Sequence, residues 1–159
     1  MPQSDDSIVI GSTRREFCAR TCQTVSLLAL GAVIPACGGS STAPDAPALP
    51  SVSGSLSGRT LTIAVAAGSP LATVGGAAIV TASTGSYLVA RTADATCVAV
   101  TAVCTHEGCT VSGFANGQYM CPCHGSQFNT SGGVIAGPAS IPLRQFPTTF
   151  ANNVVTISV

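Results

Sequence analysis

From residue 59 onward, the chain consists of short apolar segments separated by turn residues. The segments are rich in β-branched residues, and large apolar residues alternate within them with small or polar ones. Gly, Ser, Asn and Pro interrupt the chain about every ten residues, and no segment keeps the period of a helix. This pattern predicts an all-β fold, an antiparallel sandwich or barrel. The expected strands lie at 60–67, 77–82, 87–93, 96–103 and 153–159.

The pair Asn116-Gly117 interrupts this pattern in the second half of the chain. Apolar and aromatic residues flank the pair at 111–114 and 118–120. Asn-Gly favours the two-residue turn of a β-hairpin, because both residues accept a positive φ angle. Such a hairpin would bring the flanking segments 104–109 and 121–128 to the same end of a sheet.

The first 36 residues have a different composition. Arg14 and Arg15 stand side by side, and an uncharged apolar run follows at 25–34. This pattern resembles a twin-arginine signal peptide. One alternative is a membrane anchor, but a run of about ten apolar residues is too short to span a membrane. The other alternative is a chance pair of arginines. The sequence around Cys37 also resembles a lipoprotein processing site, so we expect lipid on Cys37. Pro35 is unusual at such a site and leaves ordinary cleavage as the alternative.

Residues 37–58 are rich in Gly, Ser, Ala and Pro and hold few large apolar groups. Such a segment buries too little surface to offset the entropy lost on ordering. The sequence therefore predicts a flexible linker over 37–58 and a folded domain over 59–159. A lipid on Cys37 would make this linker a membrane tether.

Charge limits the possible partners. The chain of 159 residues has six arginines, no lysine and six acidic residues, and only 8% of its residues are charged. No basic surface is available to bind phosphate backbones, so we expect no nucleic acid partner.

Cysteine and histidine gather in two segments, CTHEGC at 104–109 and CPCHGSQF at 121–128. These segments hold four of the eight cysteines and both histidines. Zinc is the first interpretation to test, but six candidate ligands exceed the four of a tetrahedral site and the spacings fit poorly. Cys97, inside an expected strand, reads as a buried thiol rather than a ligand.

The two segments resemble the Rieske [2Fe-2S] family, whose pattern is C-x-H followed by C-x-x-H. The resemblance covers roughly residues 70–159 and implies a domain with a cluster-binding subdomain of two loops. It implies one [2Fe-2S] cluster per chain. The implied metal ligands are Cys104, His106, Cys121 and His124.

The resemblance also selects a disulfide. The residues alone allow three pairings of four cysteines, whereas the additional cysteines match the family branch with a Cys109–Cys123 disulfide. Gly137 and Pro138 resemble the family's proline loop over the cluster.

Three further residues are expected to tune the reduction potential, which spans roughly −150 to +300 mV for clusters with two histidine ligands. Ser126 stands where high-potential members place a hydroxyl that donates to a sulfide. Phe128 replaces their tyrosine, and Glu107 replaces an apolar residue beside an exposed histidine. The last two departures weaken the interpretation as a respiratory subunit, although both residues are also compatible with ordinary core and surface positions.

We therefore expect an exported one-electron carrier on the periplasmic side of a bacterial membrane, with no substrate site of its own. Its expected partners are a redox donor and acceptor, such as a cytochrome, a quinol-oxidising enzyme or a molybdenum enzyme. The alternatives are a Rieske subunit of a cytochrome bc complex, a subunit of an arsenite-oxidase-like enzyme, and a non-redox metal-binding module.

Overall fold

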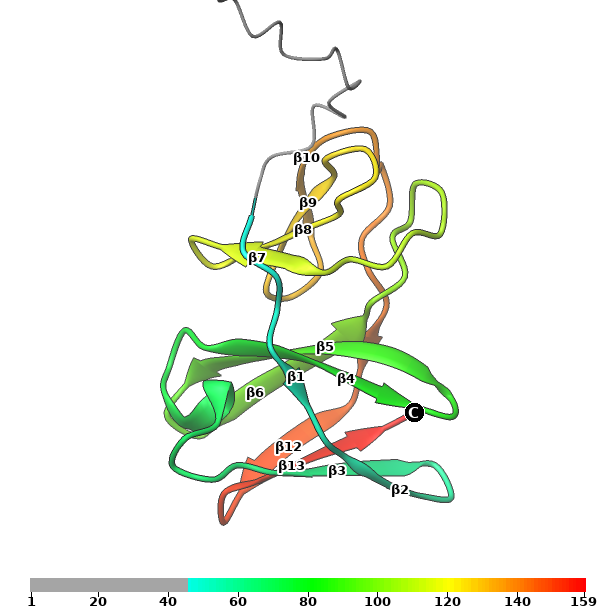
Figure 1. Ribbon diagram of the computed structural model, residues 1–159. Helices are drawn as coiled ribbons and strands as arrows, with labels where there is room; N and C mark the ends of the chain where they lie inside the picture. Colours follow the sequence, from blue (N-terminus) through cyan, green and yellow to red (C-terminus); the bar gives the residue numbers. More distant parts are fainter. Residues whose placement is uncertain (1–45) are drawn as a thin grey trace, which may run out of the picture. The chain divides into compact units, whose positions relative to one another are not determined.

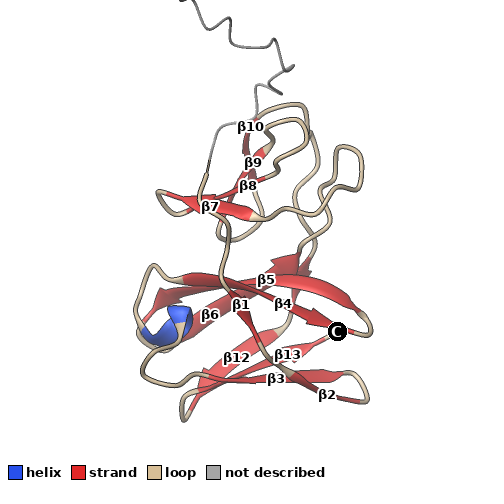
Figure 2. Cartoon of the chain, in the orientation of Figure 1, coloured by secondary structure: helices blue, strands red, loops and turns tan. Residues whose placement is uncertain are grey.

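A computed structural model of the chain describes residues 46–159 (Figure 1). The expected signal peptide at 1–36, Cys37 and the first part of the expected linker lie outside the described residues. Within 46–159 the regular structure consists of strands and one 3-10 turn, η1 at Pro70–Ala72 (Figure 2). No helix in this part of the chain is long and apolar enough to cross a membrane.

Two sheets form the base of the domain and confirm the expected all-β fold. Their strands pair antiparallel except β1, which pairs parallel with β4. The first sheet has the order β1-β4-β5-β6-β11, with strands Ser51–Val52, Ala77–Ala82, Gly85–Ala93, Thr96–Thr101 and Gln145–Phe146. The second has the order β12-β13-β3-β2, with strands Thr148–Ala151, Val154–Ser158, Thr60–Ala64 and Ser55–Ser57.

A third, smaller sheet lies on the other side of the five-stranded sheet (Figure 1). The turn at Asn116 and Gly117 joins β7 (Gly113–Ala115) to β8 (Gln118–Met120), and both turn residues have positive φ angles, 53° and 73°. The hairpin predicted from this pair is confirmed, because Ala115 pairs with Gln118 across a two-residue loop. The sheet has the order β10-β9-β8-β7, with strands Val134–Ala136, Gln127–Asn129, Gln118–Met120 and Gly113–Ala115.

The five-stranded sheet is buried on both faces. Along β5, Tyr87 and Val89 pack against the second sheet, whereas Leu88 and Ala90 pack toward the third. Successive side chains of a strand point to opposite faces, so a strand in a middle layer carries apolar residues at consecutive positions. The alternation expected from the sequence therefore does not hold in β5, where residues 87–90 are buried at four consecutive positions.

The linker predicted over 37–58 is wrong for its second half. Leu49 is buried in the core beside the third sheet, and its backbone N–H donates to Ser112 O at 2.7 Å. Ala48 bridges Gly113, and β1 and β2 join the two base sheets. Composition misled here, because backbone pairing and two or three apolar anchors order a segment that is otherwise small and polar. The ordered domain therefore begins at least ten residues before the expected boundary at 59.

The burial of Leu49 makes a prediction about its substitution. Leu49→Ala should lower the free energy of unfolding by about 2 to 4 kcal/mol, because it opens a cavity in a packed core. Val74→Ala is the matched control: Val74 is 51% exposed and should change stability by less than about 0.5 kcal/mol. Urea unfolding of both variants measures the difference. Equal stabilities would mean that residues 46–49 do not belong to the folded domain.

Candidate metal centre

Two loops with the same backbone hydrogen bonds carry the cysteines and histidines. In the first loop, Cys104 N–H donates to Cys109 O at 2.8 Å, and Gly108 N–H donates to Cys104 O at 2.9 Å. In the second, Cys121 N–H donates to Ser126 O at 2.9 Å, and Gly125 N–H donates to Cys121 O at 3.0 Å. Each loop is thus closed on its first cysteine.

A glycine at the fifth position makes this closure possible in both loops. Gly108 and Gly125 have φ angles of 75° and 72°, a region that residues with a Cβ atom rarely adopt. The chain must turn back there to reach the carbonyl of the first cysteine. The G in CTHEGC and in CPCHG is therefore a backbone requirement.

The Cys109–Cys123 disulfide ties the two loops together, with a Cα–Cα distance of 6.5 Å. The pairing expected from the family resemblance is confirmed. A cross-link between segments separated by 14 residues removes conformational freedom from the unfolded chain. It holds the first loop against the second.

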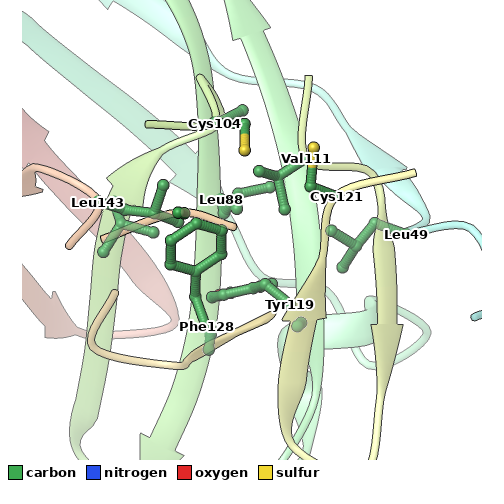
Figure 3. Close-up of a cluster of buried hydrophobic side chains, with 13 residues drawn as sticks. Leu49, Leu88, Cys104, Val111, Tyr119, Cys121, Phe128 and Leu143 are labelled. Atoms are coloured by element: carbon green, nitrogen blue, oxygen red, sulfur yellow. The ribbon is translucent and has the colours of Figure 1, made fainter. Parts of the chain in front are cut away.

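The thiols of Cys104 and Cys121 are free and buried. Figure 3 shows both at one end of a hydrophobic cluster, with Val111 near them and Phe128 and Tyr119 farther in. Burial raises the pKa of the Cys121 thiol, and a hydrogen bond with Cys104 raises it further, whereas backbone N–H groups of the following residues lower it. A metal that binds these sulfurs must displace their protons.

The two histidines lie edge to face, with ring centroids 5.0 Å apart. His106 Nδ1 is buried and has no hydrogen-bond partner. The His124 side chain is 47% exposed, and its Nδ1 lies 3.7 Å from Glu107 Oε2, while Glu107 itself is 62% exposed. One imidazole thus points a ring nitrogen inward, and the other stands at the surface beside a carboxylate.

The segment 137–142 folds back over the second loop. Gly137 has a φ angle of +93°, and a Cβ atom there would lie 2.6 Å from Ser126 Cα. Ala139 N–H donates to Ser126 Oγ at 3.1 Å. The buried Ser126 hydroxyl therefore keeps its own hydrogen for another acceptor, and the exposed Pro138 lies between these two contacts.

Sequence reasoning missed one contact of this segment and found no role for one aromatic residue. Thr105, inside the first loop, donates its hydroxyl hydrogen to Ile141 O at 2.5 Å. Nothing in the sequence pointed to Thr105.

Tyr119 lies opposite Phe128 in the β8–β9 pair, and both side chains are fully buried. The Tyr119 hydroxyl has no partner, and burial raises the pKa of this phenol. Both rings form the floor beneath the cysteines.

Cys97 does not join the site. It lies in the core between the two base sheets, on the face of the central sheet opposite to the loops. Its thiol is free and buried, and burial raises its pKa. The interpretation as a buried thiol is confirmed.

The donors fit a cluster of two metal ions better than one ion. Among the described residues, the donor atoms of His106, His124 and Glu107 lie within 4.8 Å of one another, and the free thiols of Cys104 and Cys121 share a hydrogen bond. A single tetrahedral zinc needs all four donors about 3 to 4 Å from one another. In a [2Fe-2S] cluster with two cysteines and two histidines, the sulfurs bind one iron and the imidazoles the other. The pairing of two free thiols and the pairing of two imidazoles match the second arrangement.

Comparison with known proteins agrees with this geometry. The sequence model of the Rieske [2Fe-2S] domain family matches residues 63–147. The chain is 44% identical over 61 residues to the cytochrome b6-f complex iron-sulfur subunit of Chlorobaculum thiosulfatiphilum, a match that covers 38% of this chain and 34% of that relative. It is 53% identical over 45 residues to the cytochrome b6-f complex iron-sulfur subunit 2 of Synechocystis sp., covering 28% and 25%.

These matches are local. The chain spans about a quarter to a third of the length of these two relatives. A solved chain from the complex of reduced oxygenase and oxidized ferredoxin in carbazole 1,9a-dioxygenase aligns with a TM-score of 0.54 at 23% identity, covering 64% of this chain and 94% of that one. This structural likeness shows the shared fold.

The close approach at Gly137 makes a prediction. Gly137→Ala should destabilise the domain by about 2 kcal/mol or more, because the new methyl group meets the backbone at Ser126 in a left-handed conformation. Gly117→Ala is the control: its φ angle is +73°, but nothing lies within 4 Å, so it should cost only about 1 kcal/mol. Thermal unfolding separates the two. Equal losses would mean that the segment 137–142 does not pack on Ser126.

Proposed function

This chain belongs to the Rieske [2Fe-2S] domain family, and from this premise we propose that it carries single electrons between two redox partners. A [2Fe-2S] cluster is the cofactor of this family and supplies the one-electron chemistry when bound. The observation that carries the proposal is a pair of free buried thiols, Cys104 and Cys121, on the same two loops as two imidazoles whose donor atoms lie within 4.8 Å of each other.

The proposed ligands are Cys104 and Cys121 for one iron and His106 and His124 for the other. The buried, unpartnered Nδ1 of His106 supports its role. Neutral imidazoles in place of two thiolates raise the reduction potential above that of four-cysteine clusters. Exposure of His124 places a ring at the surface where a proton can be exchanged as the charge of the site changes.

Side chains that surround the proposed ligands set the potential within the family range. Ser126 keeps its hydroxyl hydrogen available, which stabilises added negative charge on the cluster. Glu107 stands beside His124 and opposes added negative charge. Phe128 packs in the core without a hydroxyl group, so it donates no hydrogen bond to the site.

For the place of action we propose the periplasmic side of a bacterial membrane. The paired arginines at 14–15 and the apolar run at 25–34 support export in a folded state, and Cys37 supports a lipid anchor. The proposed electron donors and acceptors are proteins, such as cytochromes or quinol-oxidising enzymes.

A second candidate is the iron-sulfur subunit of a quinol-oxidising cytochrome complex. The relatives that are subunits of cytochrome b6-f complexes favour it, with up to 53% identity over the matched residues. Purification of the chain from its own membranes decides between a separate carrier and a stable complex with a cytochrome b.

Metal analysis of ligand variants tests the proposed site. The purified chain should hold two irons and two acid-labile sulfides, and its reduced form should give an EPR signal. Cys104→Ala and Cys121→Ala should each abolish both, because one iron would lose half of its protein ligands. Cys97→Ala is the control and should keep the full iron content. One zinc per chain and no sulfide would instead support a non-redox metal-binding module.

Two substitutions should shift the midpoint potential in opposite directions. Glu107→Gln removes a negative charge beside His124 and should raise the potential on the order of tens of millivolts. Ser126→Ala removes a hydrogen-bond donor and should lower it. Asp94→Asn removes the same charge at the opposite end of β6 and should leave the potential nearly unchanged. Protein-film voltammetry measures all three, and equal shifts for Glu107→Gln and Asp94→Asn would deny Glu107 a local role.

A further inference from the structure

A groove of about 580 Å³ runs from the first loop along the end of the five-stranded sheet. Residues from three segments line it, 84–87, 101–105 without Ala102, and 141–146 without Leu143 and Gln145, together with Val159. We propose that this groove is a second electron port, which docks an acidic patch with apolar neighbours on a redox protein. The proposal rests on the proposed function, because it takes Cys104 as a ligand of the cluster.

The groove approaches the site from the cysteine side. Cys104 and Thr105 line it, although Cys104 is almost fully buried. His106, Glu107 and His124 do not line it. A partner seated in the groove would therefore lie beside Cys104, while the histidine end stays open for another partner. A carrier with two ports can hold its donor and its acceptor at the same time.

Charge determines the chemistry of the expected partner. Arg144 lines the groove, and its guanidinium lies 4.7 Å from the centre of the Phe146 ring. The described residues contain one ion pair, between His124 and Glu107, so Arg144 has no carboxylate partner among them. Stacking on Phe146 holds the cation in place without neutralising it. A carboxylate on the partner would form an ion pair with Arg144.

Exposed aliphatic side chains border the same groove. Val103 is 52% exposed and Ile141 is 60% exposed, and both line it together with Pro142. A small anion bound inside the groove would leave these side chains in water. A protein surface with an acidic residue beside apolar ones would cover them, which is why we assign the groove to a protein partner.

The transfer balances without a proton or a further reactant. The reduced domain loses one electron, and the docked partner gains that electron. No bond of the chain forms or breaks. The reverse transfer, from a reduced partner to the oxidised domain, uses the same contact.

The first test uses hexacyanochromate(III), a paramagnetic trianion that is not reduced under these conditions, as the probe for anion binding. It should broaden backbone amide NMR signals of 84–87 and of Arg144 in the full chain. Arg144→Gln should reduce this broadening several-fold at low salt. Arg59→Gln is the matched control, because it removes the same charge from a side chain whose Nε donates to Val159 O at the end of the groove, and it should have a smaller effect.

The second test uses electron transfer to ferricyanide, which takes one electron and becomes ferrocyanide. Arg144→Gln should slow oxidation of the reduced, cluster-loaded chain by about threefold to tenfold at low ionic strength, and the difference should disappear at high salt. Oxidation by the cation tris(phenanthroline)cobalt(III) should not slow.

Broadening centred on 106–107 and 124 would overturn the proposal. Equal effects of Arg144→Gln and Arg59→Gln in either test would also overturn it, because Arg144 would then attract the probe no better than a cation beside Val159 does. These failures differ from failure of the proposed function. A chain that binds no iron would show no cluster absorbance to bleach or recover with ferricyanide, whereas the chromium probe still reports whether the groove binds anions.

Discussion

The structure depends on one constraint: two free thiols must stay buried at the end of a hydrophobic core, within reach of two imidazoles. Cys104 and Cys121 occupy that position above Phe128 and Tyr119 (Figure 3). The five-stranded sheet supplies the other wall of the same core through residues such as Leu88. That sheet is buried on both faces, so the second base sheet covers the side that faces away from the loops. The thiols therefore belong to a core that two of the three sheets enclose.

Backbone hydrogen bonds within each loop and the disulfide between the loops hold the site residues together above this core. Each loop returns to its first cysteine through a glycine with positive φ, and the Cys109–Cys123 disulfide joins the loops. The segment 137–142 then closes over Ser126 and Thr105. The result is a site whose sulfur side is enclosed and whose histidine side is open. This asymmetry suits electron transfer, since the two thiols are shielded from water while His124 is exposed at the surface.

Much of this was predictable from the sequence. Strands with β-branched residues and the Asn116-Gly117 turn were evident, because both signals are local. The site residues were found because their spacing resembles a family motif. The double burial of the central sheet was not evident, since a strand buried on both faces shows no alternation. The pairing of 46–49 with β7 and the contact of Thr105 with Ile141 depend on tertiary contacts that leave no local pattern.

The most direct test of the account counts histidine nitrogens at the cluster. The reduced protein is prepared with ¹⁵N-labelled histidine and studied by pulsed EPR. We predict strong couplings from two histidine nitrogens. His106→Ala and His124→Ala should each remove one of these couplings or abolish the cluster together with its iron. Couplings from no histidine in a protein that holds iron and sulfide would contradict the assignment of the two imidazoles and the function built on it.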